Sequence, residues 1–205
     1  MNFEALISFI VATSFLACSP GPDNIFVLTQ SIVNGRKFGL ATVFGLISGC
    51  LVHTTLLAFG VSAIIKESEN LFFFIKLFGA IYLLYLAYKV YKSDANIILS
   101  NEIKEKKSTA QLFKQGFIMN VLNPKVSIFF LAFFPGFLFS DSTSTVIQFY
   151  VLGLIFMLVS LVIFSTIAFL AGTISEKIKE NQKIGLYLKW MQIIVFVLIA
   201  GFVLM

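Results

Sequence analysis

The feature that most constrains this chain is the hexapeptide Ser19-Pro20-Gly21-Pro22-Asp23-Asn24, which interrupts an otherwise apolar segment from Phe3 to Gln30. Such a segment is long enough to cross a membrane as a helix. Each proline removes a backbone donor and clashes with the preceding turn, so we expect the helix to break near Gly21. Broken backbone at membrane depth is tolerated only where it is buried in protein or lines a wet cavity. An ionisable residue there indicates a functional site, and Asp23 is therefore the first candidate.

The composition of the chain indicates an integral membrane protein. Of its 205 residues, 59% are hydrophobic, which exceeds the roughly 45–50% that is usual in soluble domains. A hydrocarbon core about 30 Å thick requires about 20 apolar residues per helix, so the length accommodates six helices with short loops. We therefore expect an all-α integral membrane protein with one transmembrane domain over residues 1–205.

Apolar runs between polar or charged stretches define the expected helices. They are Phe3 to Ser31, Phe38 to Ile65, Leu71 to Tyr91, Phe113 to Phe139, Thr145 to Gly172, and Ile184 to Leu204. The long polar stretch 93–110 has little to bury and predicts a cytoplasmic linker between halves at 1–92 and 111–205. Because each half has three helices, the second half enters the membrane from the opposite side. This arrangement predicts two inverted three-helix repeats in which helices 1 and 4 are broken.

Basic residues gather in the first, third and fifth connections between these segments. They include Arg36 and Lys37 in the first, Lys104 in the third, and Lys177 and Lys183 in the fifth. By the positive-inside rule these connections are cytoplasmic, so both termini are expected outside the cytoplasm. The net charge of +5 is spread over separate loops. Orientation in the lipid bilayer explains that spread better than nucleic-acid binding does.

A second interruption divides the fourth segment at Asn120-Val121-Leu122-Asn123-Pro124-Lys125. Paired interruptions in corresponding positions of two halves point to a transporter site. Proline is favoured at the first position of a helix, so Pro22 and Pro124 are expected to open half-helices that Gly21 and Asn123 cap. In the inverted topology both positive N-terminal ends would point at the middle of the membrane. A substrate carboxylate would be stabilised there.

Asp23 and Lys125 are the charged residues of the two interruptions. At about 1.5 Å per helical residue, each lies roughly 16–20 Å from the expected cytoplasmic edge, which is near the midplane. An amino acid could meet a carboxylate, a lysine and free backbone donors in that place. The alternative is that the two charges only pair with each other or cap their own helices. Burying two charges for packing alone is usually no better than using apolar residues, which favours the functional interpretation.

His53 is the single histidine of the chain. It could relay protons together with Asp23 near neutral pH, although a packing role is the simpler interpretation. One histidine, with Cys18 and Cys50 inside apolar segments, indicates neither a metal site nor a disulfide framework, and no cofactor is expected. One histidine and one midplane carboxylate also leave no nucleophile and base for an intramembrane enzyme.

Several longer sequence motifs occur together in this chain. They are Ser-Pro-Gly-Pro-Asp-Asn at 19–24, Gly-Arg-Lys-x-Gly at 35–39, Lys-Leu-x-Gly-Ala-x-Tyr-Leu at 76–83, Gly-Phe-x-x-Asn-x-Leu-Asn-Pro-Lys at 116–125, and Phe-Pro at 134–135. Over nearly its whole length the chain thereby resembles the LysE/RhtB family of amino-acid exporters. The resemblance implies a six-helix inner-membrane protein that expels amino acids, driven by proton entry. It also implies site residues at Pro20, Gly21, Pro22, Asp23, Asn24, Asn123, Pro124 and Lys125.

These patterns predict a secondary active transporter that exports a small amino acid or a close derivative by proton antiport. The expected substrate-binding set is the eight residues just named together with Asn120. Export of another small solute or of a cation is the nearest alternative, since acidic and amide groups also suit metal ions, but Lys125 would repel a divalent ion. A purely structural membrane protein, in which Asp23 could be replaced freely, is a further alternative. Assembly as a homodimer stays open.

Overall fold

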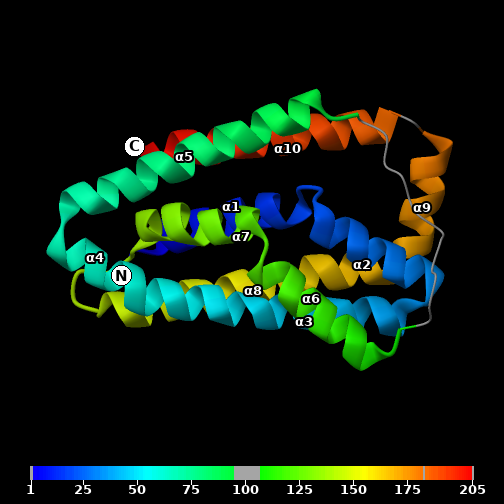
Figure 1. The fold of residues 1–205 in the computed structure, drawn as a ribbon, viewed down its shortest axis with the longest axis horizontal. Coiled ribbons are helices and arrows are strands. Elements are labelled where there is room, and N and C mark those ends of the chain that lie inside the picture. Colours follow the sequence, from blue (N-terminus) through cyan, green and yellow to red (C-terminus); the bar gives the residue numbers. More distant parts are fainter. Residues whose placement is uncertain (1, 95–106, 182, 205) are drawn as a thin grey trace.

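The computed structural model describes residues 2–94, 107–181 and 183–204, which form helices joined by short turns (Figure 1). In chain order the elements are α1 Phe3–Cys18, α2 Pro22–Val33, α3 Arg36–Leu56, the π-turn η1 Leu57–Val61, α4 Ser62–Glu67, α5 Glu69–Lys92, α6 Thr109–Val121, α7 Pro124–Ile128, the π-turn η2 Phe129–Phe133, the 3-10 turn η3 Phe134–Phe137, α8 Thr145–Phe169, α9 Ala171–Glu180 and α10 Lys183–Leu204. The expected all-α membrane architecture is therefore confirmed.

The membrane crossings are of two kinds. Four helices are long and apolar enough to cross a membrane as continuous rods, namely Arg36–Ile65, Asn70–Lys92, Thr145–Phe169 and Lys183–Leu204. Two further crossings are bent pairs, α1 with α2 at 58° and α6 with the helical run Pro124–Phe137 at 48°. With each bent pair counted as one crossing, the described residues provide the six expected crossings. The predicted breaks in the first and fourth are present.

Local chemistry explains where each bent helix restarts. Gly21 precedes Pro22, which opens α2, and Asn123 precedes Pro124, which opens α7. Proline suits the first helical turn because its missing N–H would have no partner there in any case. The Asn123 side chain also accepts a hydrogen bond from the Lys125 backbone N–H at 3.0 Å, as a helix N-cap should. Both predicted half-helix starts are confirmed.

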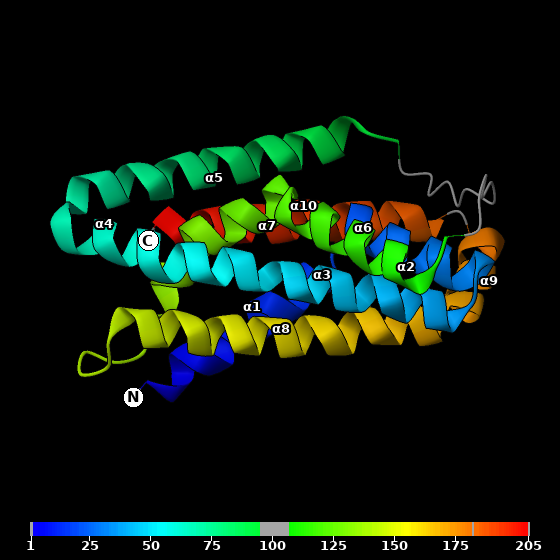
Figure 2. The same cartoon turned by 60° about the horizontal axis from the view of Figure 1, so that its bottom comes forward.

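The two half-helices α2 and α7 extend from the middle of the bundle toward opposite ends (Figure 1). The long helix α3 packs against both α6 and α8, and α5 packs along α10 (Figures 1 and 2). The opposite directions of α2 and α7 place both helix starts near mid-bundle. The inverted relation of the two complete halves stays a prediction.

Glycines permit the close approach of α3 and α6. A side-chain carbon built at Gly45 would collide with the backbone carbonyl of Phe113, one at Gly116 would collide with the backbone of Thr42, and one at Gly49 would collide with the Asn120 side chain. Small residues at such a contact let two helix backbones approach more closely than larger side chains would. This packing fixes α6, and hence the second break, against α3.

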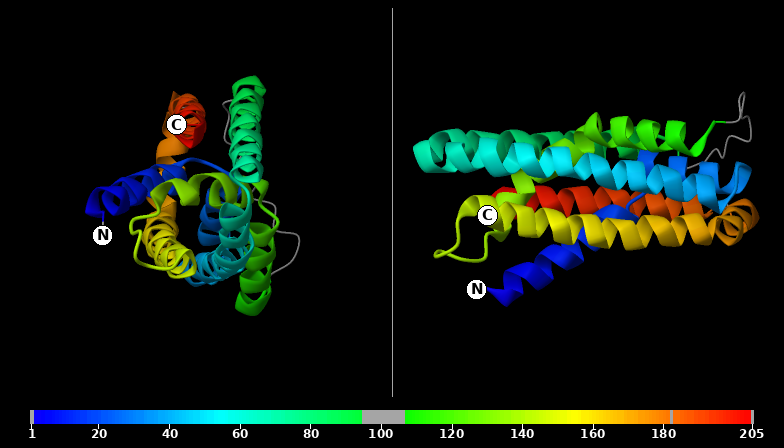
Figure 3. Two further views of the ribbon diagram at one scale, coloured as in Figure 1. Left: turned by 90° about the vertical axis from the view of Figure 1, so that its left-hand side faces the viewer. Right: turned by 90° about the horizontal axis from the view of Figure 1, so that it is seen from below.

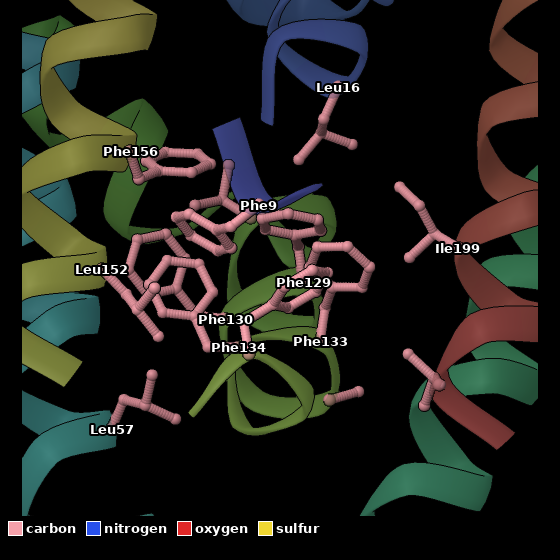
Figure 4. Packing of buried hydrophobic residues seen from close by; sticks show 14 of the residues in the cluster. Phe9, Leu16, Leu57, Phe129, Phe130, Phe133, Phe134, Leu152, Phe156 and Ile199 are labelled. Carbon is pink, nitrogen blue, oxygen red and sulfur yellow. The ribbon is translucent and has the colours of Figure 1, made fainter. Parts of the chain in front are cut away.

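A cluster of phenylalanines fills the space where α1, η2, η3 and α8 meet (Figure 4). Phe130 stacks on Phe134 with ring centroids 4.1 Å apart, Phe129 stacks on Phe133 at 4.5 Å, and Phe9 meets Phe134 edge-on at 4.9 Å. Aromatic pairs in such geometries contribute roughly 0.5–1.5 kcal/mol each beyond the area they bury. The cluster holds the second half of the broken fourth crossing against its neighbours.

Two features differ from the sequence-based expectation. The fifth segment was expected to continue to Gly172, but α8 ends at Phe169, and α9 lies across the end of the bundle (Figures 1 and 3). The α9 helix is amphipathic and buries Ala171 and Ser175, so it suits a membrane surface rather than the hydrocarbon core. The π-turns η1 and η2, which pack against each other, were also not predicted.

The ends of the bundle differ in which connections they carry. The turn between α2 and α3 lies at the same end as α9, while both termini and the turn before α8 lie toward the other end (Figure 1). The basic first and fifth connections therefore share one end, as a positive-inside orientation requires. Most of the expected linker 93–110 lies outside the described residues, and the side of the membrane that each terminus faces stays a prediction.

Candidate functional site

The two helix breaks meet at a small cavity inside the bundle. Its volume is about 30 Å³. It is lined by Leu16, Ala17, Asp23, Asn24, Cys50, Asn120, Lys125, Val126, Phe156, Ser160 and Phe164. Four of the expected site residues, Asp23, Asn24, Asn120 and Lys125, are thus brought together from segments about 100 positions apart in sequence.

Asp23 stands in the first turn of α2 and is buried, with 7% of its surface exposed. Its Oδ2 accepts a hydrogen bond from Asn123 Nδ2 at 2.8 Å. Its Oδ1 is buried and has no hydrogen-bond partner in the protein. An unsatisfied buried carboxylate oxygen is costly, so this atom is available to a ligand donor.

Lys125 reaches across the break from the first turn of α7. Its Nζ donates to the backbone carbonyl of Ser19 at 3.3 Å and to that of Leu16 at 3.5 Å, two carbonyls near the C-terminal end of α1. The ammonium also lies 5.4 Å from the ring centroid of Phe196. Lys125 and Asp23 share the cavity, but the lysine is not among the hydrogen-bond partners of the carboxylate. A direct ion pair of these two residues is therefore not what holds the halves together in this conformation.

Asn123 makes the polar contact that joins the second break to Asp23. One end of its carboxamide caps α7 and the other donates to Asp23. Asn24 stabilises the first break separately, because its Nδ2 donates to the Ala17 carbonyl at 2.8 Å. Gly21 lies beside the lysine, since a side-chain carbon there would be in ordinary contact with Lys125 Nζ at 3.6 Å. Each of these residues therefore shapes the cavity or its charged groups.

Asn120 connects the cavity to α3. Its Oδ1 lies 3.7 Å from the sulfur of Cys50, which acts as a weak donor, and its backbone carbonyl lies 3.1 Å from His53 Nε2. His53 does not line the cavity. It borders a separate hollow of about 250 Å³ with Ser127 and Phe130. Any proton transfer between His53 and Asp23 would therefore need an intermediate group, and the relay role stays a prediction.

A comparison with known families matches residues 14–205 to the LysE type translocator family. The chain belongs to the LysE family. It is 30% identical over 183 residues to the homoserine/homoserine lactone efflux protein of Salmonella typhimurium, covering 89% of this chain and 88% of the relative. It is 28% identical to the leucine efflux protein of Enterobacter sp. (strain 638) over 178 residues, covering 87% and 84% of the two chains. A search of solved structures found no match.

In this LysE-family protein the remaining expected residues lie around the cavity rather than in its wall. Pro22 and Pro124 open the two half-helices, and Pro20 and Gly21 belong to the first break. Ser160, which α8 contributes to the cavity wall, was not predicted from the sequence. A serine within the strongly apolar run 145–169 was the available signal. The binding roles of all these residues stay predictions.

Proposed function

We propose that this protein exports a small zwitterionic amino acid, or a close derivative, across the inner membrane. The observation that supports this most directly is the juxtaposition, in one cavity, of the free Oδ1 of Asp23 and the ammonium of Lys125. A zwitterion carries the two complementary charges. The names of the relatives, which include homoserine and leucine efflux proteins, agree with a substrate of this class.

In the proposed mechanism the substrate ammonium binds Asp23, and its carboxylate binds Lys125 and backbone N–H groups at the start of a half-helix. Opposite charges in a site of low dielectric attract more strongly than they do in water. Protonation of Asp23 from the outside would remove the charge that holds the ammonium and so release the substrate. Export would then be coupled to proton entry, with Asp23 as the group that carries the proton.

A cavity of 30 Å³ does not accommodate an amino acid, because a single water already needs about 10–15 Å³ by this measure. The described conformation is therefore a closed one, and binding requires the two breaks to separate. A second cavity, of about 330 Å³, extends from Pro20 and Asn24 to Ile174 and Ile178 of α9. It adjoins the bundle end with the basic connections, and we assign it as the route by which substrate arrives from the cytoplasm.

The experiment that tests this proposal removes both charges at once. Asp23→Asn combined with Lys125→Met leaves neither half of a zwitterion with its partner, while it avoids the roughly 3–5 kcal/mol penalty of stranding one buried charge. We expect a folded protein that exports nothing. The measurement is efflux of a panel of amino acids from proteoliposomes under a pH gradient, normalised to folded protein.

A control variant replaces a lysine that does not line the cavity. Lys107 precedes α6, its Nζ donates to Gln115 Oε1 at 2.8 Å, and Lys107→Met should leave efflux unchanged. Near wild-type, pH-driven efflux by the Asp23→Asn, Lys125→Met protein would show that these charges do not bind the substrate. Efflux of simple cations but of no amino acid by the wild type would instead favour the cation alternative.

A further inference from the structure

Ser160 is a buried polar residue in the middle of an apolar helix. It lies in α8, is 1% exposed, and its hydroxyl has no hydrogen-bond partner in the protein. The Oδ1 atom of Asp23 is also buried and has no hydrogen-bond partner in the protein. Both residues line the 30 Å³ cavity. Two unsatisfied polar atoms from different crossings therefore share one small space.

Serine and threonine in helices commonly satisfy the hydroxyl locally by donating to the carbonyl four residues earlier. Ser31 does so toward Val27 at 2.7 Å, and Thr166, six residues after Ser160 on the same helix, does so toward Val162 at 2.8 Å. Ser160 does not form this bond. Its hydroxyl is thus left for a group inside the cavity, and an unsatisfied buried hydroxyl calls for such a partner.

We propose that Ser160 and Asp23 Oδ1 together form the subsite for the substrate's ammonium group, so that α8 completes the binding site that the two broken helices begin. This inference rests on the proposed export of amino acids. A substrate ammonium has three N–H donors, and Asp23 Oδ1 and Ser160 Oγ supply two acceptors.

Lys125 sets the orientation of the bound molecule. Its ammonium would repel the ammonium of the substrate and attract the carboxylate, so the two ends of the zwitterion are sorted within one site. Ser160 carries no charge and is compatible with this order. It adds discrimination between an amino acid and an analogue of the same size that lacks the amino group. That discrimination is a property that a merely structural serine would not affect.

The test measures transport by Ser160→Ala in proteoliposomes with two pairs of probes. L-Leucine is compared with 2-hydroxy-4-methylpentanoate, and L-homoserine with 2,4-dihydroxybutanoate, in which a hydroxyl replaces the amino group. Loss of one hydrogen bond to a charged group should raise the half-saturating concentration of the amino acid roughly ten- to hundredfold. The concentration of the matching hydroxy acid that half-inhibits amino-acid transport should differ less than threefold between Ser160→Ala and the wild type. Ser160→Thr, which keeps the hydroxyl, should recover part of the loss.

Ser31→Ala is the matched control, since Ser31 is also buried in a membrane helix but does not line the cavity. It should leave both half-saturating concentrations unchanged. Equal loss for amino acids and hydroxy acids in Ser160→Ala, or loss for hydroxy acids alone, would overturn the ammonium assignment. Either result leaves the proposed export intact, because that proposal depends on efflux by the wild type and on the Asp23 and Lys125 variants.

Discussion

Asn123 allows a direct measurement of how strongly the two broken helices are joined. Its carboxamide caps α7 through Lys125 N–H and bonds to Asp23 across the break. A helix N-cap contributes about 1 kcal/mol, and a hydrogen bond to a charged acceptor contributes roughly 1.5–3 kcal/mol. Asn123→Ala removes both, so we expect it to destabilise the protein by roughly 2.5–4 kcal/mol.

Asn123→Ser separates the two contributions. Serine is a good N-cap, but its hydroxyl occupies the place of the asparagine Cγ and ends too early to reach Asp23. The serine variant should therefore lose only the roughly 1.5–3 kcal/mol of the bond across the break. A double-mutant cycle with Asp23→Ala should return a coupling energy in that range, which corresponds to a change of about ten- to over a hundredfold in the unfolding equilibrium.

The assay is an unfolding titration with sodium dodecyl sulfate in mixed micelles, followed by thiol labelling. Cys50 is buried and Cys18 is exposed, and these are the 2 cysteines of the chain. In a Cys18→Ser background, labelling therefore reports exposure of the cavity wall. A coupling energy below about 0.5 kcal/mol, within the scatter of independent sites, would refute the view that the Asn123–Asp23 bond joins the two halves.

Three further predictions concern packing and orientation. Gly45→Ala should destabilise the α3–α6 contact by roughly 1–3 kcal/mol, whereas Gly60→Ala, with open space around it, should be neutral in the same titration. Gln148→Leu removes four hydrogen bonds to the turn before α8, so protease cleavage there should accelerate. Cysteines at Lys107 and at Ser142 should react with an impermeant reagent from the cytoplasmic and external sides respectively, and the reverse pattern would contradict the topology.

The sequence predicted well those features that depend on local chemistry. Pro22 and Pro124 locate the helix breaks because proline cannot continue a helix from within, and Asn123 was expected to cap the second half-helix, which it does. The helix count follows from the lengths of apolar runs. The family follows from the strings around both breaks.

Features that depend on partners distant in sequence were not predicted. Nothing near Asn123 indicates that its amide donates to Asp23, 100 positions away. Ser160 was missed because a serine in an apolar helix ordinarily satisfies its hydroxyl on its own backbone, and only the packed structure shows that it does not. The α9 helix was missed because its run is short and rich in lysine, so in sequence it resembles a connection.

The small volume of the polar cavity has a consequence for cellular energetics. Under the proposed coupling to proton entry, each proton that crosses the membrane releases about 2.3 kcal/mol per 100 mV, so a carrier that rested with a continuous wet path would drain the potential that drives it. Here the charged groups are enclosed by Val126, Phe156 and Phe164 in about 30 Å³, and hydrophobic constrictions of this kind exclude water columns. In the described conformation this cavity would therefore interrupt a continuous water column. Under the proposed coupling, a cell could hold many copies in its membrane and spend proton-motive force only when substrate is present.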